Sequence, residues 1–181
     1  MIPIEACVFV LLLAFGFVGM SRSFPRELGA TVGFVALLVI FELLGARAAP
    51  LAAQGLALAG FPMGDDMAVW TLYTLAIGVT IYFVYQGETL TFDALAAPGP
   101  VGKVFDFSVG LFNGWLVVGT WWYYTHALGY PIQRAGLYQP PLTDRAARLI
   151  ELTPIALLPP DRSLVYLAAF LVLLLVLKVM R

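Results

Sequence analysis

Five long apolar runs separated by shorter polar segments dominate the chain. They cover residues 4–20, 28–45, 67–85, 104–125 and 164–179. A bilayer hydrocarbon core about 30 Å thick is crossed by a helix of roughly 20 apolar residues. We therefore expect an all-α, polytopic integral membrane protein with five transmembrane helices. Glu5 precedes the first run and no small-residue cleavage pattern follows it, so we interpret this run as a retained helix rather than a signal peptide.

The segments between the runs differ in kind. Residues 47–66 are rich in Ala and Gly, which predicts an interfacial or re-entrant segment. Pro98, Gly99 and Pro100 predict a helix break before the fourth run. Residues 126–162 are rich in Pro, which predicts an extramembrane loop.

One short interfacial helix is expected within that loop, over residues 144–152, with Thr143 or Asp144 as its N-cap. The predicted organisation is a four-helix membrane domain (1–125), the proline-rich loop (126–162) and a C-terminal transmembrane helix (163–181).

Composition narrows the class of protein. Hydrophobic residues make up 61% of the chain and charged residues 12%, whereas soluble domains carry roughly 25% charged residues. A soluble domain, a disordered chain and a nucleic-acid binder are therefore disfavoured. One Cys and one His argue against a disulfide framework and a Cys/His metal site. We expect no enzyme, no cofactor and no metal, and as partners the lipid bilayer together with other membrane subunits or a second copy of the chain.

Basic residues near the ends of the runs predict orientation. Five spans place the termini on opposite sides, and each side carries five basic residues. On one side all five adjoin a run: Arg22, Arg26, Lys103, Lys178 and Arg181. On the other side three lie in the long loop, and the set is Arg47, Arg134, Arg145, Arg148 and Arg162. The first set is expected to face the cytoplasm of a bacterial inner membrane, with the N-terminus outside and the C-terminus inside.

Glu42 is an acidic residue near the end of the second run. A carboxylate at membrane depth is costly and by default indicates an ion or proton path. The alternative is a position close to the interface, where Glu42 pairs with Arg47 or a polar neighbour.

The fourth run carries small residues at helical spacing. Gly110 and Gly114 form a GxxxG pattern, and Gly119 follows. Such a pattern allows a neighbouring backbone to approach closely, and Asn113 can donate a hydrogen bond to another helix. We expect the fourth helix to be a packing helix.

An aromatic cluster ends the same run: Trp121, Trp122, Tyr123 and Tyr124. Trp and Tyr prefer the membrane interface, so these side chains are predicted to be anchors, with a pigment or quinone contact as the alternative.

A charged cluster is expected where the first loop meets the fourth run. Arg22, Arg26 and Glu27 lie in the loop, and Asp106 opens the run. Glu27 in the first turn of a helix suits the helix dipole. Asp106 is interpreted as a helix-start charge, or as an ion-pair partner of Arg22 or Arg26.

Two segments together resemble the colicin V production protein (CvpA) family of bacterial inner-membrane proteins. They are Arg22-Ser23-Phe24-Pro25-Arg26-Glu27 and Asp106-Phe107-Ser108-Val109-Gly110-Leu111-Phe112-Asn113-Gly114. The corresponding family patterns are Arg-Gly-Phe-x-Arg-Glu and Asp-Arg-x-x-Gly-x-x-x-Gly. Ser23 and Phe107 depart from them, an Arg-Gly pair further along the helix is absent, and the fifth run is an addition to the usual four spans. The resemblance implies a non-catalytic membrane protein that supports toxin production or export and envelope robustness.

Three functions follow as alternatives. The first is a CvpA-like scaffold or small pore of the inner membrane that supports export or envelope function. The second is an accessory structural subunit of a larger respiratory or photosynthetic complex, favoured by the featureless apolar fifth run. The third is a proton or small-solute channel that uses Glu42.

Overall fold

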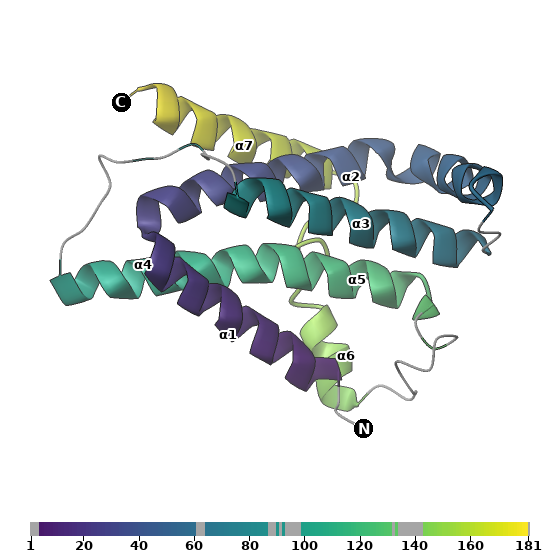
Figure 1. The fold of residues 1–181 in the computed structure, drawn as a ribbon, viewed down its shortest axis with the longest axis horizontal. Helices are drawn as coiled ribbons and strands as arrows, with labels where there is room; N and C mark the ends of the chain where they lie inside the picture. The colour runs from purple at the N-terminus through teal and green to yellow at the C-terminus, as the bar shows by residue number, and fades with distance from the viewer. Residues whose placement is uncertain are drawn as a thin grey trace.

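The regular structure consists of helices wherever the computed structural model describes the chain, which is over residues 4–60, 64–86, 90, 92, 99–131, 133 and 143–180 (Figure 1). The elements are α1 (Ile4–Arg22), α2 (Phe24–Leu58), α3 (Asp65–Gln86), α4 (Gly99–Gly114), η2 (Trp115–Gly119), α5 (Thr120–Ala127), α6 (Asp144–Ile150) and α7 (Ser163–Val179). The expected all-α class is confirmed for these ranges. Pro98, Arg181 and the loop residues 134–142, including Arg134, lie outside them.

Within the described part of the chain, four helical stretches are long and apolar enough to cross a membrane. They are α1, the first part of α2 (Phe24–Gly45), α3, and the continuous stretch Gly99–Ala127 formed by α4, η2 and α5. This architecture is compatible with a multi-pass membrane protein. The fifth predicted span, α7, is apolar but has 17 residues, so four of the five predicted spans are helices long and apolar enough to cross a membrane, and five spans are not confirmed.

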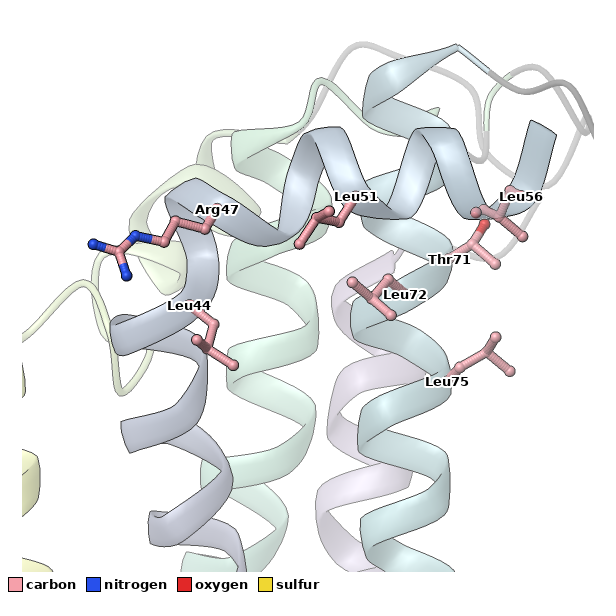
Figure 2. A pocket seen from close by; sticks show the side chains of 8 residues that line it. Leu44, Arg47, Leu51, Leu56, Thr71, Leu72 and Leu75 are labelled. Atoms are coloured by element: carbon pink, nitrogen blue, oxygen red, sulfur yellow. The ribbon is translucent and has the colours of Figure 1, made fainter. Parts of the chain in front are cut away.

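The second helix is longer than its apolar run. It starts at Phe24 with Pro25 in its first turn, where the missing N–H is harmless, and continues past Pro50 to Leu58. A proline inside a helix displaces the carbonyl four residues earlier and produces a bend. Figure 2 shows this bend near Arg47, after which the helix lies across the end of the bundle. We call residues 46–58 the α2 arm. The segment expected over 47–66 as interfacial or re-entrant is thus helical as far as Leu58, and its position relative to the membrane stays a prediction.

The fourth helix begins earlier than predicted. Helix α4 starts at Gly99, with Pro100 in its first turn, so the expectation that Asp106 opens the helix is wrong. The prediction placed the helix start too late because the residues before the apolar run include Gly, Pro and Lys. These residues are polar or weakly apolar, but they are compatible with the first turns of a helix.

The short helix expected at residues 144–152 is present as α6, and it ends at Ile150. Thr143 is its N-cap, and its side chain accepts a hydrogen bond from the Ala146 N–H at 3.0 Å.

The core surrounds α2, which packs against α3, α4 and α7. Its inward side chains include Phe34, Val35 and Leu38, each at most 2% exposed. Helix α1 packs mainly against α4, and Figure 1 shows these two helices crossing. A smaller apolar cluster joins α1 to α6 through Val8, Trp122 and Ile150.

Candidate functional site

A group of polar side chains from four helices meets inside the bundle, near the start of α2. Its members are Arg22 of α1, Glu27 and Thr31 of α2, Tyr85 of α3 and Asn113 of α4. We call these five residues the polar clamp. Its centre is the carboxylate of Glu27, whose side chain has no exposed surface. A buried charge is tolerated only when it is paired and hydrogen-bonded.

The Glu27 carboxylate has a partner from each of the other three helices. Arg22 Nε lies 3.0 Å from Oε1. Asn113 Nδ2 donates to Oε2 at 2.8 Å, and the Tyr85 hydroxyl donates to the same oxygen at 3.1 Å. Arg22 also donates to the Tyr85 carbonyl at 2.7 Å and lies over the Tyr85 ring. The clamp therefore fixes α1, α3 and α4 to one residue of α2.

Asn113 uses both ends of its amide. Besides the carboxylate, its Nδ2 donates to the main-chain carbonyl of Glu27 at 2.9 Å, and its Oδ1 accepts from the Thr31 hydroxyl at 2.7 Å. Its side chain is fully buried. The predicted cross-helix hydrogen bond of Asn113 is confirmed.

Asp106 makes a second connection between the same helices. Its Oδ1 accepts from the Phe24 N–H at 2.6 Å, which satisfies a free donor at the start of α2. Its ionic partner is Lys103 at 3.3 Å, whereas Arg22 pairs with Glu27 and Arg26 is exposed. The alternative of an Asp106 ion pair with Arg22 or Arg26 is therefore wrong, because Lys103 stands one turn earlier on the same helix.

The residue between α1 and α2 has an unusual backbone. Ser23 has a φ of 77°, in a region that glycine enters far more easily than serine. This conformation lets two helices meet with a single intervening residue. Ser23 is also the position at which the resembled family pattern has glycine.

Glycines build the contact between α1 and α4. A side-chain carbon added at Gly110 of α4 would overlap the Phe15 carbonyl oxygen and lie 2.9 Å from the Gly19 Cα and 3.1 Å from the Gly16 Cα. Gly114 has a similar contact with the Phe15 side chain, at 2.8 Å. Gly119 faces Pro154 instead. The structure thus places Gly110 and Gly114 at the α1–α4 contact and Gly119 at a different one.

Glu42 lies at the other end of the bundle. Its Oε2 accepts a hydrogen bond from the hydroxyl of Ser163, the first residue of α7, at 2.6 Å. Every residue of α2 between Thr31 and Glu42 is apolar or glycine. Glu42 and Glu27 therefore belong to separate polar regions.

The aromatic cluster packs largely against other helices. Trp122 is buried and donates to the Tyr130 hydroxyl at 3.2 Å. Trp121 donates to Thr74 at 3.2 Å, and the Tyr124 ring centroid lies 4.4 Å from that of Tyr73. Tyr123 is half-buried beside Tyr124. These contacts hold α5 to α3 and to the segment after α5.

Sequence reasoning missed Thr31, Tyr85, Gly16 and Gly19. Gly16 and Gly19 sit three residues apart on α1, which was a detectable small-residue pattern. Thr31 and Tyr85 carried no such signal, because a single Thr or Tyr near a helix end is common in membrane helices.

The fold and the clamp define a class: a helical bundle compatible with several membrane crossings, tied together by one buried ion pair and by close glycine contacts. Among the described residues, no cluster of three His, Cys, Asp or Glu side chains forms a metal site. No family model, no curated protein and no solved structure matches this chain. Membership of the CvpA family thus stays a prediction based on the two quoted segments.

Proposed function

We propose that this protein is a non-catalytic, CvpA-like scaffold of a bacterial inner membrane that supports export or envelope function. The observation that carries the proposal is the polar clamp. It joins the two segments on which the resemblance rests through the bond from Asn113 to Glu27, and Asp106 adds a second link by accepting from the Phe24 N–H. Segments separated by about 80 residues thus act as one structural unit. The glycine-like backbone at Ser23 supports the same comparison.

A scaffold is favoured over a pore because the buried carboxylate of Glu27 is held by fixed partners and the described residues of α2 offer no polar route from it to Glu42. Glu27 is fixed by partners from three other helices, so it is not a free relay group. Between Thr31 and Glu42 the buried side chains of α2 are apolar, among them Phe34, Val35 and Leu38. A proton or solute route needs polar side chains or water along its length. Glu42 is hydrogen-bonded to Ser163, and this single carboxylate is a poor basis for a proton or solute route.

The proposal includes α7 as a fifth span. Ser163 contacts Glu42, and Lys178 lies 5.6 Å from the ring of Phe92, whose N–H donates to the Pro25 carbonyl. Helix α7 therefore runs antiparallel to the membrane-crossing part of α2 along most of its length. Seventeen residues rise about 25 Å, which is at the short end of what spans a bilayer. Five crossings give the proposed orientation, with the N-terminus outside and the C-terminus inside.

The test is complementation in the bacterium that carries the gene. We expect deletion to weaken the envelope against detergent or to reduce export, and the wild-type gene to restore it. Asn113→Leu, which breaks the clamp, is expected to fail, while Glu42→Gln is expected to restore function at equal protein levels.

Loss of function in Glu42→Gln alone would contradict the scaffold and favour a channel. Stoichiometric recovery of the gently solubilised protein with a large energy-converting complex would instead identify an accessory subunit.

A further inference from the structure

An apolar cavity of about 450 Å³ lies between the α2 arm and α3. Its walls are mainly leucines, namely Leu44, Leu51, Leu56, Leu72 and Leu75. Figure 2 shows the arm passing over the cavity, with Leu72 and Leu75 on the flanking helix below it. The volume falls within the range of about 300–1,000 Å³ typical of small-molecule sites.

The cavity lies where the membrane-crossing helices end. Leu44 belongs to the last turn of the crossing stretch Phe24–Gly45, and Leu72 lies two turns from the start of α3 at Asp65. The ends of these helices correspond to the boundary between the acyl chains and the headgroups of the bilayer. Water finds too few polar partners in such a cavity to occupy it stably. An acyl chain from the adjoining lipid matches its chemistry.

One cation lies at the edge of this cavity. Among the described residues that line it, Arg47 is the only charged one, and its side chain is exposed. Figure 2 shows its guanidinium pointing outward, at the opposite end of the cavity from Thr71. The acidic residues Asp65 and Asp66 lie in the first turn of α3 and are not among the described residues that line the cavity. A guanidinium group binds phosphate oxygens through two parallel hydrogen bonds.

We propose that this cavity binds one membrane phospholipid, with an acyl chain among the leucines and the phosphate on Arg47. The inference rests on the membrane location given under the proposed function. It adds a specific lipid site to that location.

Gly55 offers a way to block the cavity. It lines the cavity, and a side-chain carbon at this position meets no atom within 4 Å. Gly55→Phe therefore fits the helix and places a ring in the space we assign to the lipid. Gly78→Phe is the matched control, because Gly78 is also open, lies on α3 and does not line the cavity.

The first test uses the full chain in nanodiscs containing phosphatidylglycerol with a photoreactive group in the middle of one acyl chain. After irradiation and proteolysis, labelled peptides are quantified by mass spectrometry. We expect labelling of the arm and of the Leu72–Leu75 segment, a several-fold decrease there in Gly55→Phe, and no decrease in Gly78→Phe. Unchanged labelling of the arm in Gly55→Phe would overturn the site.

The outward face of α1, including the exposed Val10 and Phe17, is an internal control. Labelling of α1 without labelling of the arm refutes the lipid site and leaves the membrane location standing. Absence of labelling on both refutes the membrane location itself.

The second test concerns the phosphate. Native mass spectrometry measures how much phosphatidylglycerol stays bound after release from the nanodisc. We expect Arg47→Gln to lower retention about tenfold, as for loss of the charge-assisted contact, and Arg47→Lys to give an intermediate value, because Lys keeps the charge but not the paired hydrogen bonds. Equal retention by wild type and Arg47→Gln would remove Arg47 from the site.

Discussion

Ser23 holds a backbone conformation that suits glycine better than serine. Its φ of 77° places the side chain in a crowded arrangement, and strain of this kind is typically 1–3 kcal/mol. The serine is kept in that conformation because α1 and α2 are both fixed around it, by Arg22 on one side and Glu27 on the other. The strain is thus offset by the clamp.

Ser23→Gly is expected to stabilise the protein by about 1 kcal/mol, because it relieves this strain. Ser108→Gly is the control: Ser108 is exposed in the interior of α4, where glycine costs about 1 kcal/mol. Thermal unfolding in a mild detergent measures both. A lower unfolding temperature for Ser23→Gly than for wild type would contradict the positive φ.

Glu27 and Glu42 are carboxylates on the same helix with different surroundings. Removing the charge of Glu27 breaks the buried Arg22–Glu27 ion pair, so Glu27→Gln is expected to destabilise the bundle by about 3 kcal/mol. Glu42 is only partly buried and bonds to the Ser163 hydroxyl, and Glu42→Gln keeps a group that can make this bond. Its expected effect is below about 1 kcal/mol.

Denaturant titration followed by circular dichroism compares these two variants. Similar losses of stability in both variants would mean that the Glu27 carboxylate does not hold the helices together as the centre of the polar clamp.

At the scale of elements, the contact of α1 with α4 depends on the absence of side chains. Gly110→Ala adds a carbon that overlaps the Phe15 carbonyl oxygen, so the helices must separate, at a cost of about 1–3 kcal/mol. Gly78→Ala adds the same carbon in open space on α3 and is expected to change stability by less than about 1 kcal/mol. The unfolding temperatures of the two variants provide the measurement. A neutral Gly110→Ala would show that α1 and α4 lie further apart.

The proposed crossing of α7 rests on its position beside α2 rather than on its length. Its antiparallel course beside α2 predicts that its two ends lie on opposite sides of the membrane. In a Cys7→Ser background, single cysteines at Ser163 and Lys178 can be tested with a membrane-impermeant thiol reagent in intact cells and in inverted vesicles. We expect the two positions to react from opposite sides, with Ser163 on the outside. Labelling of both from one side would place α7 along the membrane surface.

At the scale of the whole molecule, the helices followed directly from the apolar runs, because a bilayer requires about 20 apolar residues per crossing. The burial of Glu27 did not follow, since a carboxylate in a first helical turn is usually a solvated helix-start charge. Its partners Tyr85 and Asn113 are 58 and 86 residues away. Pairs of residues so far apart in the chain meet only because of the way the helices pack. No local pattern in a single sequence indicates that packing.

The helix start at Gly99 and the arm beyond Gly45 escaped prediction for a simpler reason. Both contain Pro and Gly residues, which normally indicate loops. Pro100 is tolerated in a first turn and Pro50 only bends α2. Local propensity was overridden in both cases by the continuation of an adjoining stable helix.

The central claim is that the bundle is a closed scaffold, with the clamp and Glu42 separated by an apolar core. The most direct test is proton flux into vesicles that contain the purified full-length protein under an imposed pH gradient. The account predicts flux equal to that of protein-free vesicles, for wild type and for Glu42→Gln alike. Wild-type flux above that level, abolished by Glu42→Gln, would contradict the closed bundle and identify a proton path.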